Sequence, residues 1–408
     1  MIFKTFSVKE KVLFALQSIT FLGLFLYSFS QIDLGLTFSK ITFLRNIVTY
    51  FQHIGYFERP LSSLTYVFLV SLLTLLYCVT LYLANHKKVQ KNYVWSVIIV
   101  GAVLLAFSYN AFSYDIFNYI FDAKIITHYH ANPYVHKALD YPGDPMLAFM
   151  HWTHREYPYG PVWLGLTVPL SFIGMQIFLI TFFFFKMLMA LSFLGTVYFI
   201  GKIFQKLFPQ REIFGLIFFG LNPLVLIESL VSAHIDIVMM FLAVAAFSFL
   251  ISQNYSKTYI LLMLSIGIKF LTGILLPVFI VIHVMQHRKK AINWDSMFGL
   301  ILILLMVGVV VESKQSGNFQ PWYLLAPLSF SAFLVHKYYV LILTIVISVV
   351  SLFLYLPYLY LGNWDPPVPQ LLSQIIIMSY TIAFCFTSMY FLYKQIIFAK
   401  AKKISKKK

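Results

Sequence analysis

Apolar runs recur along the whole chain and constrain its fold more than any other feature. A helix needs about 20 apolar residues to cross a bilayer. In a chain that is 60% hydrophobic and 11% charged, such runs lie at roughly 12–29, 61–84, 93–112, 177–203, 213–231, 235–252, 296–312, 322–335, 338–361 and 372–394. Because helices satisfy their own backbone hydrogen bonds in lipid, we expect an all-α polytopic membrane protein, with residues 1–408 as one transmembrane domain.

Two segments do not fit a single crossing. Val162 to Met175 has about 14 residues, and Tyr259 to Met285 has about 27 with Gly267 and Lys269 inside it. We interpret the first as a re-entrant or interfacial helix and the second as a broken hairpin of two short helices. This arrangement gives about 12 membrane-inserted helices.

The charges predict an orientation for these helices. The net charge is +16, and the basic residues form short clusters between the apolar runs, as the positive-inside rule describes. The proposed helix arrangement places every cluster on one side, so we expect a plasma-membrane protein with both termini cytoplasmic. The tail 395–408 is then a solvated basic segment with some attraction for anionic lipid, and no nucleic-acid role is expected.

The acidic residues follow the opposite pattern. Only Glu10, Glu212 and Asp295 fall on the cytoplasmic side, whereas 11 of the 14 acidic residues face outward. Asp and Glu contribute little to setting orientation, so a site on the outer face explains this surplus better. Cys78 and Cys385 both lie inside apolar runs, which indicates no disulfide framework.

A polar island, Ser113 to Pro161, interrupts the apolar pattern. It holds five of the 14 acidic residues and five of the 11 histidines. Loops longer than about 15 residues are usually functional or disordered. This one is rich in Tyr and Trp and has Pro at its corners, so we interpret it as an ordered external active-site loop.

Four polar residues near the start of this loop follow a helical period. Asp115, Asn118, Tyr119 and Asp122 would share one face of a helix that leaves the membrane. A carboxylate at the boundary between water and lipid is partly desolvated, which makes it a better base. The alternative is that these residues only solvate an emerging helix.

The loop also contains two turn segments and five histidines. The turns are Asn132-Pro133-Tyr134 and Tyr157-Pro158-Tyr159-Gly160-Pro161, whose tyrosines suit either stacking on a sugar or an interfacial aromatic belt. The zinc signatures are absent, so we assign no metal and favour phosphate or hydroxyl contacts for some of the histidines. These histidines are His128, His130, His136, His151 and His154.

Other polar residues lie within or beside apolar runs. His234 and Asp236 are expected at the outer end of a helix pair, where acidic residues are costly and usually functional. Lys269 in an apolar run needs an anionic partner, either a carboxylate or a phosphate. Gln320, with Trp322 and Tyr323, opens a helix whose N-terminus can offer N–H groups to a phosphate. Lys186 is assigned no role.

In their order along the chain, these motifs resemble those of the GT-C superfamily of integral-membrane glycosyltransferases. The resemblance is strongest to the bacterial polyprenol-phosphate-mannose-dependent α-1,6-mannosyltransferases. The segments that carry it are SYDIFNYIFD from Ser113, the Asn132-Pro133-Tyr134 turn, YPYGP ending at Pro161, NPLVLIESLVSAHID from Asn222, GIKFLTGILLP from Gly267 and QPWYLL from Gln320.

The resemblance implies a GT-C-like bundle, and the chain departs from many family members in that we expect no soluble C-terminal domain. It also implies transfer of a hexose, mannose in that family, from a polyprenyl-phosphate donor to a glycan or lipid-linked acceptor on the outer face. The reaction would invert the anomeric carbon without a cofactor, with Asp115 as general base and Asp122 as the second catalytic carboxylate. The residues expected to bind substrate are Asn118, Tyr119, Asn132, Tyr134, Tyr157, Tyr159, His234, Asp236, Lys269, Gln320, Trp322 and Tyr323. The chain departs from its relatives in having HID at 234–236, where they often carry a Gly-His-Asn-Asp-like run.

The main alternative is a transporter or flippase of a lipid-linked saccharide. Such proteins show duplicated halves with interrupted helices in matching positions. The one broken helix here, 259–285, has no clear mate, and the polar residues concentrate on one face. The pattern therefore favours an enzyme. A lipid-headgroup transferase of another chemistry shares most of these features.

Overall fold

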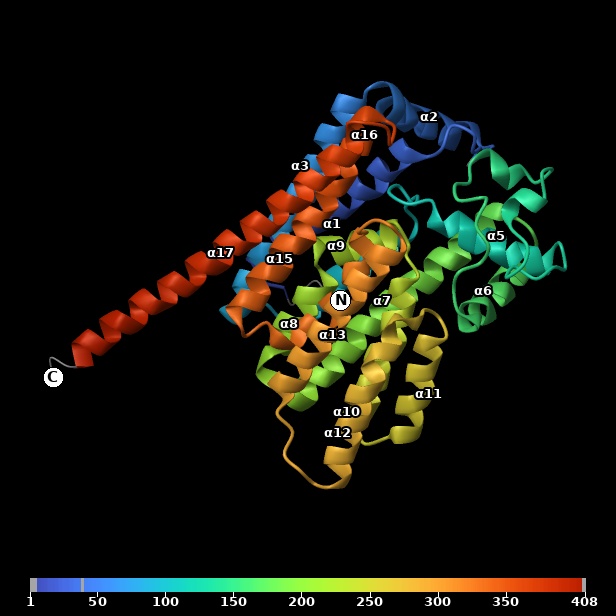
Figure 1. The fold of residues 1–408 in the computed structure, drawn as a ribbon. Helices are drawn as coiled ribbons and strands as arrows, with labels where there is room; N and C mark the ends of the chain where they lie inside the picture. Colours follow the sequence, from blue (N-terminus) through green and yellow to red (C-terminus); the bar gives the residue numbers. More distant parts are fainter. Residues whose placement is uncertain (1–5, 38–39, 406–408) are drawn as a thin grey trace.

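The structure is a computed structural model that describes residues 6–37 and 40–405, and over these residues it contains helices and no strands (Figure 1). This confirms the all-α prediction. The α-helices are α1 (Val8–Ser28), α2 (Thr42–Phe57), α3 (Arg59–Asn85), α4 (Lys91–Ala106), α5 (Asp115–Thr127), α6 (Pro161–Ile173), α7 (Phe178–Leu207), α8 (Glu212–Gly220), α9 (Pro223–Leu226), α10 (Asp236–Ile251), α11 (Tyr255–Ile266), α12 (Leu276–His287), α13 (Trp294–Gln315), α14 (Leu325–Ser331), α15 (Tyr338–Leu352), α16 (Leu356–Leu361) and α17 (Val368–Ser405).

Seven helical segments in the described part of the chain are long and apolar enough to cross a membrane, which makes this a polytopic membrane protein. They are Val8–Gln31, Arg59–Asn85, Phe178–Leu207, Phe270–His287, Trp294–Gln315, Tyr338–Leu361 and Val368–Tyr390. A pair bent by 54°, Pro209–Gly220 with Pro223–Val231, would make an eighth. The expected count of about 12 is not supported, because four further apolar helices have only 10–17 residues.

Helix boundaries differ from the expected ones in three places. The run at 93–112 is helical only to Ala106, where the chain turns toward the polar loop. The run at 322–335 is divided into two 3-10 turns that flank α14. The amphipathic helix α2 was not expected, and it exposes apolar side chains such as Phe43 and Phe57.

The expected hairpin within 259–285 is confirmed. Helix α11 ends at Ile266, the chain breaks at residues 267–269, and α12 returns along α11. The rings of Tyr255 and His283 stack 3.7 Å apart, and the Tyr259 hydroxyl lies 2.9 Å from His283 Nδ1. The start of α11 therefore lies beside the end of α12.

Contacts between distant segments define one end of the bundle. The Gln90 N–H donates to Glu10 Oε1 at 2.8 Å, and Lys91 Nζ lies 2.6 Å from Glu212 Oε1. The Phe208 ring in turn lies against His336. We call this the basic end, which comprises residues 7–11, 87–91, 202–212, 288–295 and 336–337.

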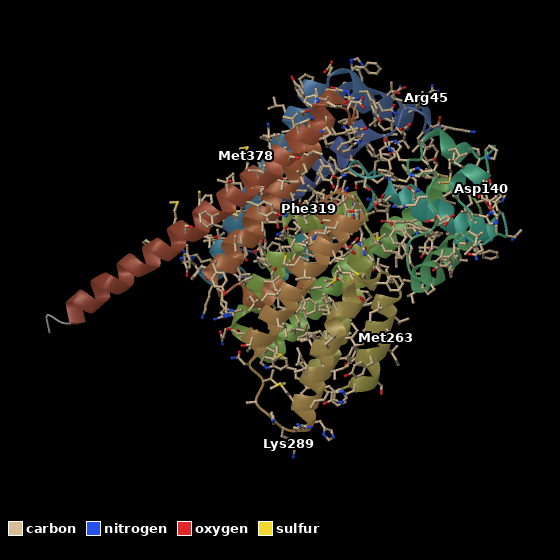
Figure 2. All side chains as sticks on the ribbon, viewed as in Figure 1. Arg45, Asp140, Met263, Lys289, Phe319 and Met378 are labelled. Carbon is tan, nitrogen blue, oxygen red and sulfur yellow. The ribbon has the colours of Figure 1, made fainter. Side chains whose placement is uncertain are left out.

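The other end, which we call the site end, carries α5 and the loops at 113–161, 232–235, 267–269 and 316–322. Figure 2 shows Lys289 of the basic end at the bottom of the view and Asp140 of the site end at the upper right. Helix α10 begins at the site end and runs toward the basic end. At 1.5 Å per residue it spans roughly 22 Å.

Candidate active site

Asp115 is the first residue of α5, and it lies against the segment that carries His234. Its backbone N–H donates to Ser113 Oγ at 3.2 Å, and the N-terminus of the helix favours a negative charge at this position. Asp115 Oδ2 lies 3.6 Å from His234 Nδ1, which is an ion-pair distance rather than a hydrogen bond. Two motifs that are more than a hundred residues apart in sequence are thus brought together.

His234 lies between two carboxylates. Its Nε2 is 3.3 Å from Glu228 Oε2, and its ring stacks on Trp322 with 3.9 Å between centroids. Glu228 Oε1 in turn accepts a hydrogen bond of 2.9 Å from the Tyr355 hydroxyl. These contacts form a continuous row of side chains: Asp115, His234, Glu228 and Tyr355.

The backbone around Glu228 is irregular, which explains how His234 reaches this position. Residues Ile227–Val231 form a π-helical turn, a feature frequent at functional sites. Ala233 follows with a left-handed φ of 61°, which is strained for a residue with a side chain. The buried Lys186 donates to the Leu230 carbonyl and, at 2.9 Å, to the Val231 carbonyl. Lys186 therefore holds the loop that positions His234.

Lys269 has carboxylate partners. Its Nζ lies 2.8 Å from Asp236 Oδ1 and 3.1 Å from Glu312 Oε1. The ammonium also lies 4.9 Å from the centroid of the Tyr323 ring. Of the two kinds of partner that the sequence left open, the structure provides the carboxylate, and two carboxylates face one cation.

The YPYGP motif docks onto the break in the α11–α12 hairpin. The Gly160 N–H donates to the Ile268 carbonyl, and the Val162 N–H donates to the Gly267 carbonyl, both at 2.9 Å. A Cβ atom on Gly160 would lie 2.1 Å from the Gly267 oxygen, so only glycine fits there. These two hydrogen bonds fix the position of Lys269 relative to α5.

Three of the expected substrate-binding residues make contacts that hold the loop itself. The Asn132 side chain accepts from the Tyr134 N–H at 3.0 Å, and the Tyr134 hydroxyl donates to the Tyr159 carbonyl at 3.1 Å. The buried Tyr157 donates to the Gly160 carbonyl at 2.8 Å. Asn132, Tyr134 and Tyr157 thus stabilise the loop, and Tyr159 interacts electrostatically with Asp115.

Helix α5 confirms the helical period of its polar residues. Asn118, Tyr119 and Asp122 are buried, and the Tyr119 ring lies edge-on to Tyr159 at 5.4 Å. Asn118 Nδ2 approaches the Trp152 carbonyl at 3.5 Å, the outer limit for a hydrogen bond. A solvated face would be exposed, so the alternative that these residues only solvate an emerging helix does not fit.

The environments of Asp115 and Asp122 separate their pKa values. Burial raises the pKa of Asp122 to about 7, although the charge of Arg155 acts in the opposite direction. Burial would also raise the pKa of Asp115, but the proximity and charge of His234 hold it below its usual value. The pKa of His234 is raised to about 9, because its carboxylate neighbours outweigh the effect of its own burial. At neutral pH, Asp115 is ionised and Asp122 is partly protonated.

The structure also adds residues that the sequence analysis did not assign to the site. Glu228 had a signal, since it closely precedes the His234 motif. Three other residues carried no such signal. Tyr355 lies within an apolar run, Glu312 lies at the end of one, and Arg155 lies in a segment that was selected for its tyrosines.

The loop histidines do not converge. The rings of His151 and Tyr114 stack at 3.9 Å, His136 lies 3.4 Å from Asp140, and His128 packs against Tyr129. Among the described residues, no group of three or more His, Cys, Asp or Glu side chains is placed to hold a metal ion. Gln320 precedes a 3-10 turn of only four residues, Pro321–Leu324, so the expected helix N-terminus is not a full helix.

Comparison with known proteins places the chain in a family. Residues 20–286, more than half of the 408-residue chain, match the MptA_B family, described as alpha-(1->6)-mannopyranosyltransferase, N-terminal domain. The match includes Asp115, His234 and Lys269. Comparisons with curated proteins and with solved structures found no match. The chain belongs to the MptA_B family of mannosyltransferases and is a membrane glycosyltransferase.

Proposed function

We propose that this protein transfers mannose from a polyprenyl-phosphate donor to a glycan or glycolipid acceptor on the outer face of the plasma membrane, with inversion and with Asp115 as general base. The observation that carries the proposal is the placement of Asp115 beside His234, at the meeting point of the family's motifs. A general base works in its ionised form, and the lowered pKa of Asp115 meets that requirement.

The proposed reaction needs one proton transfer. Asp115 accepts the proton of the acceptor hydroxyl while the acceptor oxygen forms a bond to the anomeric carbon. The bond from that carbon to the phosphate oxygen breaks, and the polyprenyl phosphate leaves with the electron pair. His234 stabilises the ionised form of Asp115 before the transfer, and its stacking on Trp322 fixes the ring.

An apolar groove beside the site supports a lipid-linked donor. It has a volume of about 430 Å³ and lies between α13, α15 and α17. Its lining includes Val310, Leu354 and Ile376, and Lys314 is the one charged residue among the described residues that line it. Leu324 connects the groove to the site, since the neighbouring Tyr323 lies under the Lys269 ammonium. We assign this groove to the first isoprene units of the donor.

The concentration of buried charge at one end supports a transferase over a flippase. Transporters place their polar binding residues near the midplane, at the interface between repeats. Here the Asp115–His234 and Lys269–Asp236 pairs both lie at the site end.

The donor assignment is tested with purified protein and a defined acceptor. Polyprenyl-phosphate mannose should support turnover, and GDP-mannose alone, without polyprenyl phosphate, should not. Turnover with the nucleotide sugar alone would overturn the donor class.

The proposed orientation places both termini and the basic end in the cytoplasm, with the four shorter apolar helices also inserted to give about 12. Single cysteines are introduced at Pro209 and at Asp140 of a variant with Cys78 and Cys385 replaced by serine. A membrane-impermeant thiol reagent applied to intact cells should label position 140 only. Labelling at position 209 would refute this topology.

A further inference from the structure

Arg155 is the cation at the site whose hydrogen-bonding capacity is least used. Its Nη2 is buried and has no hydrogen-bond partner among the described residues. Its guanidinium carbon lies 5.9 Å from the centroid of the Tyr159 ring. A buried guanidinium N–H without an acceptor is costly, so it indicates a missing ligand.

The backbone directs Arg155 inward. Trp152 has a left-handed φ of 57°, and the Arg155 N–H closes the turn by donating to the Trp152 carbonyl at 3.1 Å. The guanidinium is near enough to both Asp115 and Asp122 to influence their charges, although no ion pair is formed with either. A strained turn that holds a cation near two catalytic carboxylates is typical of a functional site.

Lys269, by contrast, is already compensated. Two carboxylates, Asp236 and Glu312, lie within 3.1 Å of its ammonium. A phosphate placed there would have to displace a buried carboxylate or accept its repulsion. Arg155 needs no such displacement, and a guanidinium can bind two phosphate oxygens at once.

We infer that Arg155, rather than Lys269, binds the phosphate of the lipid-linked donor and stabilises the polyprenyl phosphate as it leaves. This inference rests on the proposed function. Lys269 then acts as a positioning residue that fixes Asp236 and Tyr323 at the junction between the groove and the site.

The test compares farnesyl phosphate with farnesol, which differ only in the phosphate, as ligands of the full-length protein in detergent. The wild type should prefer the phosphate, and Arg155→Gln should lose on the order of 10–100-fold of that affinity. Arg155→Lys should retain part of it, because the charge remains without the planar fork. Affinity for farnesol should be the same in all three proteins.

Each result has a distinct meaning. No phosphate preference in the wild type would refute the proposed donor class. A preference that Arg155→Gln retains, or that Lys269→Met alone abolishes, would overturn the assignment to Arg155. If Arg155→Gln fails to fold, Arg155→Lys is compared with the wild type instead. Equal affinity of those two proteins for farnesyl phosphate would refute bidentate binding of the phosphate by Arg155.

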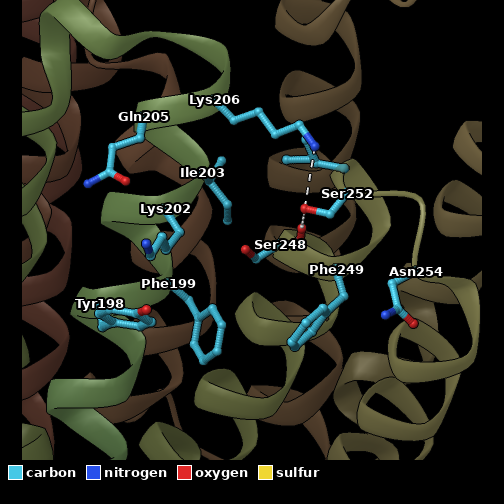
Figure 3. A pocket seen from close by; sticks show the side chains of 11 residues that line it. Tyr198, Phe199, Lys202, Ile203, Gln205, Lys206, Ser248, Phe249, Ser252 and Asn254 are labelled. Atoms are coloured by element: carbon cyan, nitrogen blue, oxygen red, sulfur yellow. Dashed lines mark hydrogen bonds between the residues drawn. The ribbon is translucent and has the colours of Figure 1, made fainter.

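A second, independent observation concerns a pocket at the basic end. This pocket, of about 520 Å³, lies between the last turns of α7 and α10 (Figure 3). Lys202 and Lys206 flank it, and Lys206 Nζ lies 3.4 Å from Ser252 Oγ. None of its lining residues is acidic. Glu212, the nearest carboxylate in sequence, accepts a hydrogen bond from the lining residue Gln205 and is paired with Lys91.

The surroundings of this pocket resemble the boundary of a membrane. Tyr198 and Phe199 supply aromatic surface one helical turn before Lys202, below both lysines in the view, and Lys202 Nζ lies 5.4 Å from the centroid of the Tyr198 ring (Figure 3). Asn254 caps the N-terminus of α11 at the opposite wall, and that terminus carries partial positive charge. Basic pockets between transmembrane helices bind anionic headgroups. We propose that this pocket binds the phosphate headgroup of an anionic phospholipid.

The second test uses full-length protein in nanodiscs of phosphatidylcholine, with or without phosphatidylglycerol. Phosphatidylglycerol should raise the melting temperature of the wild type, because a ligand that binds only the folded state stabilises it. The double variant Lys202→Gln/Lys206→Gln should lose this rise. Lys289→Gln/Lys290→Gln, which removes the same charge from an exposed loop at the same end, should keep it.

Equal loss in both double variants would mean general attraction to the anionic surface and would overturn the pocket assignment. Millimolar inorganic phosphate should not reproduce the rise. If it did, the ligand would be a free anion and the lipid assignment would be wrong.

Discussion

The two ends of the bundle use the same kinds of ion pair in different surroundings. At the basic end, Lys91 and Glu212 are separated by 2.6 Å, with 42% and 15% of their side-chain surfaces exposed. At the site end, Lys269 and Asp236 are separated by 2.8 Å, with 17% and 1% exposed. Water and ions screen the first pair, so it is worth about 0–1 kcal/mol, whereas losing one partner of the second abandons a buried charge at about 3–5 kcal/mol.

Exposed charges can therefore be replaced at little cost in stability, whereas buried paired charges cannot. Charges at the basic end act together on orientation, and no single one is decisive. At the site end each buried charge contacts a specific atom of a partner, so the loss of a single charge should be felt.

The largest effect is expected for Asp115→Asn. The amide keeps the size of the carboxylate but cannot accept a proton, so kcat with a defined acceptor should fall by roughly 10²–10⁴-fold. Binding of the lipid donor should survive. Asp122→Asn is the matched control on the same helix. An equal loss there would mean that the two carboxylates act as a pair, and near-wild-type turnover of Asp115→Asn would remove the case for this site.

Lys269→Met should lower the free energy of unfolding by about 3–5 kcal/mol, because Asp236 and Glu312 would remain buried without their cation. Thermal unfolding in detergent measures the loss. Adding Asp236→Asn to Lys269→Met should recover part of it, since one abandoned charge is removed. A variant that is stable yet has lost donor affinity would show instead that phosphate is the main partner.

The pH dependence of kcat/KM should identify the base. A base works in its ionised form, so activity falls as the pH drops through the pKa of that base. The lowered pKa of Asp115 predicts little change between pH 8 and pH 6. If Asp122, with a pKa raised to about 7, were the base, activity at pH 6 would be about tenfold below its plateau. A loss of that size would reverse the two roles.

Much of the fold follows from the apolar runs, because the length of a run sets whether a helix can cross the bilayer. The break at 267–269 could also be predicted, since Gly267 and Lys269 interrupt an otherwise apolar segment. The number of spans could not. Helices such as α4 and α10 are mostly apolar but have only 16 residues each.

The site was predictable where polar residues stand out from apolar surroundings, as Asp115, His234 and Lys269 do. Their partners were not, because pairing depends on distant contacts. Tyr355 lies 127 residues from Glu228 in sequence, and it resembles any other tyrosine of an apolar run. The role of Lys186 could not be predicted from the sequence either. Its role depends on carbonyls freed by a π-helical turn, and no sequence pattern indicated that turn.

The smallest effect is expected for Lys91→Gln at the basic end. The variant removes the partner of Glu212, as Lys269→Met removes that of Asp236, and the two pairs have nearly equal distances. Because 42% of the Lys91 side-chain surface is exposed and Glu212 also accepts a hydrogen bond of 2.8 Å from Gln205, the cost should stay below about 1 kcal/mol. Unfolding of both variants is measured in the same detergent, and raising the salt concentration should shrink the Lys91→Gln difference further. Suppose that Lys91→Gln lowers the free energy of unfolding as much as Lys269→Met does, or by an amount that salt does not change. The ion pairs at the two ends would then contribute to stability in the same way.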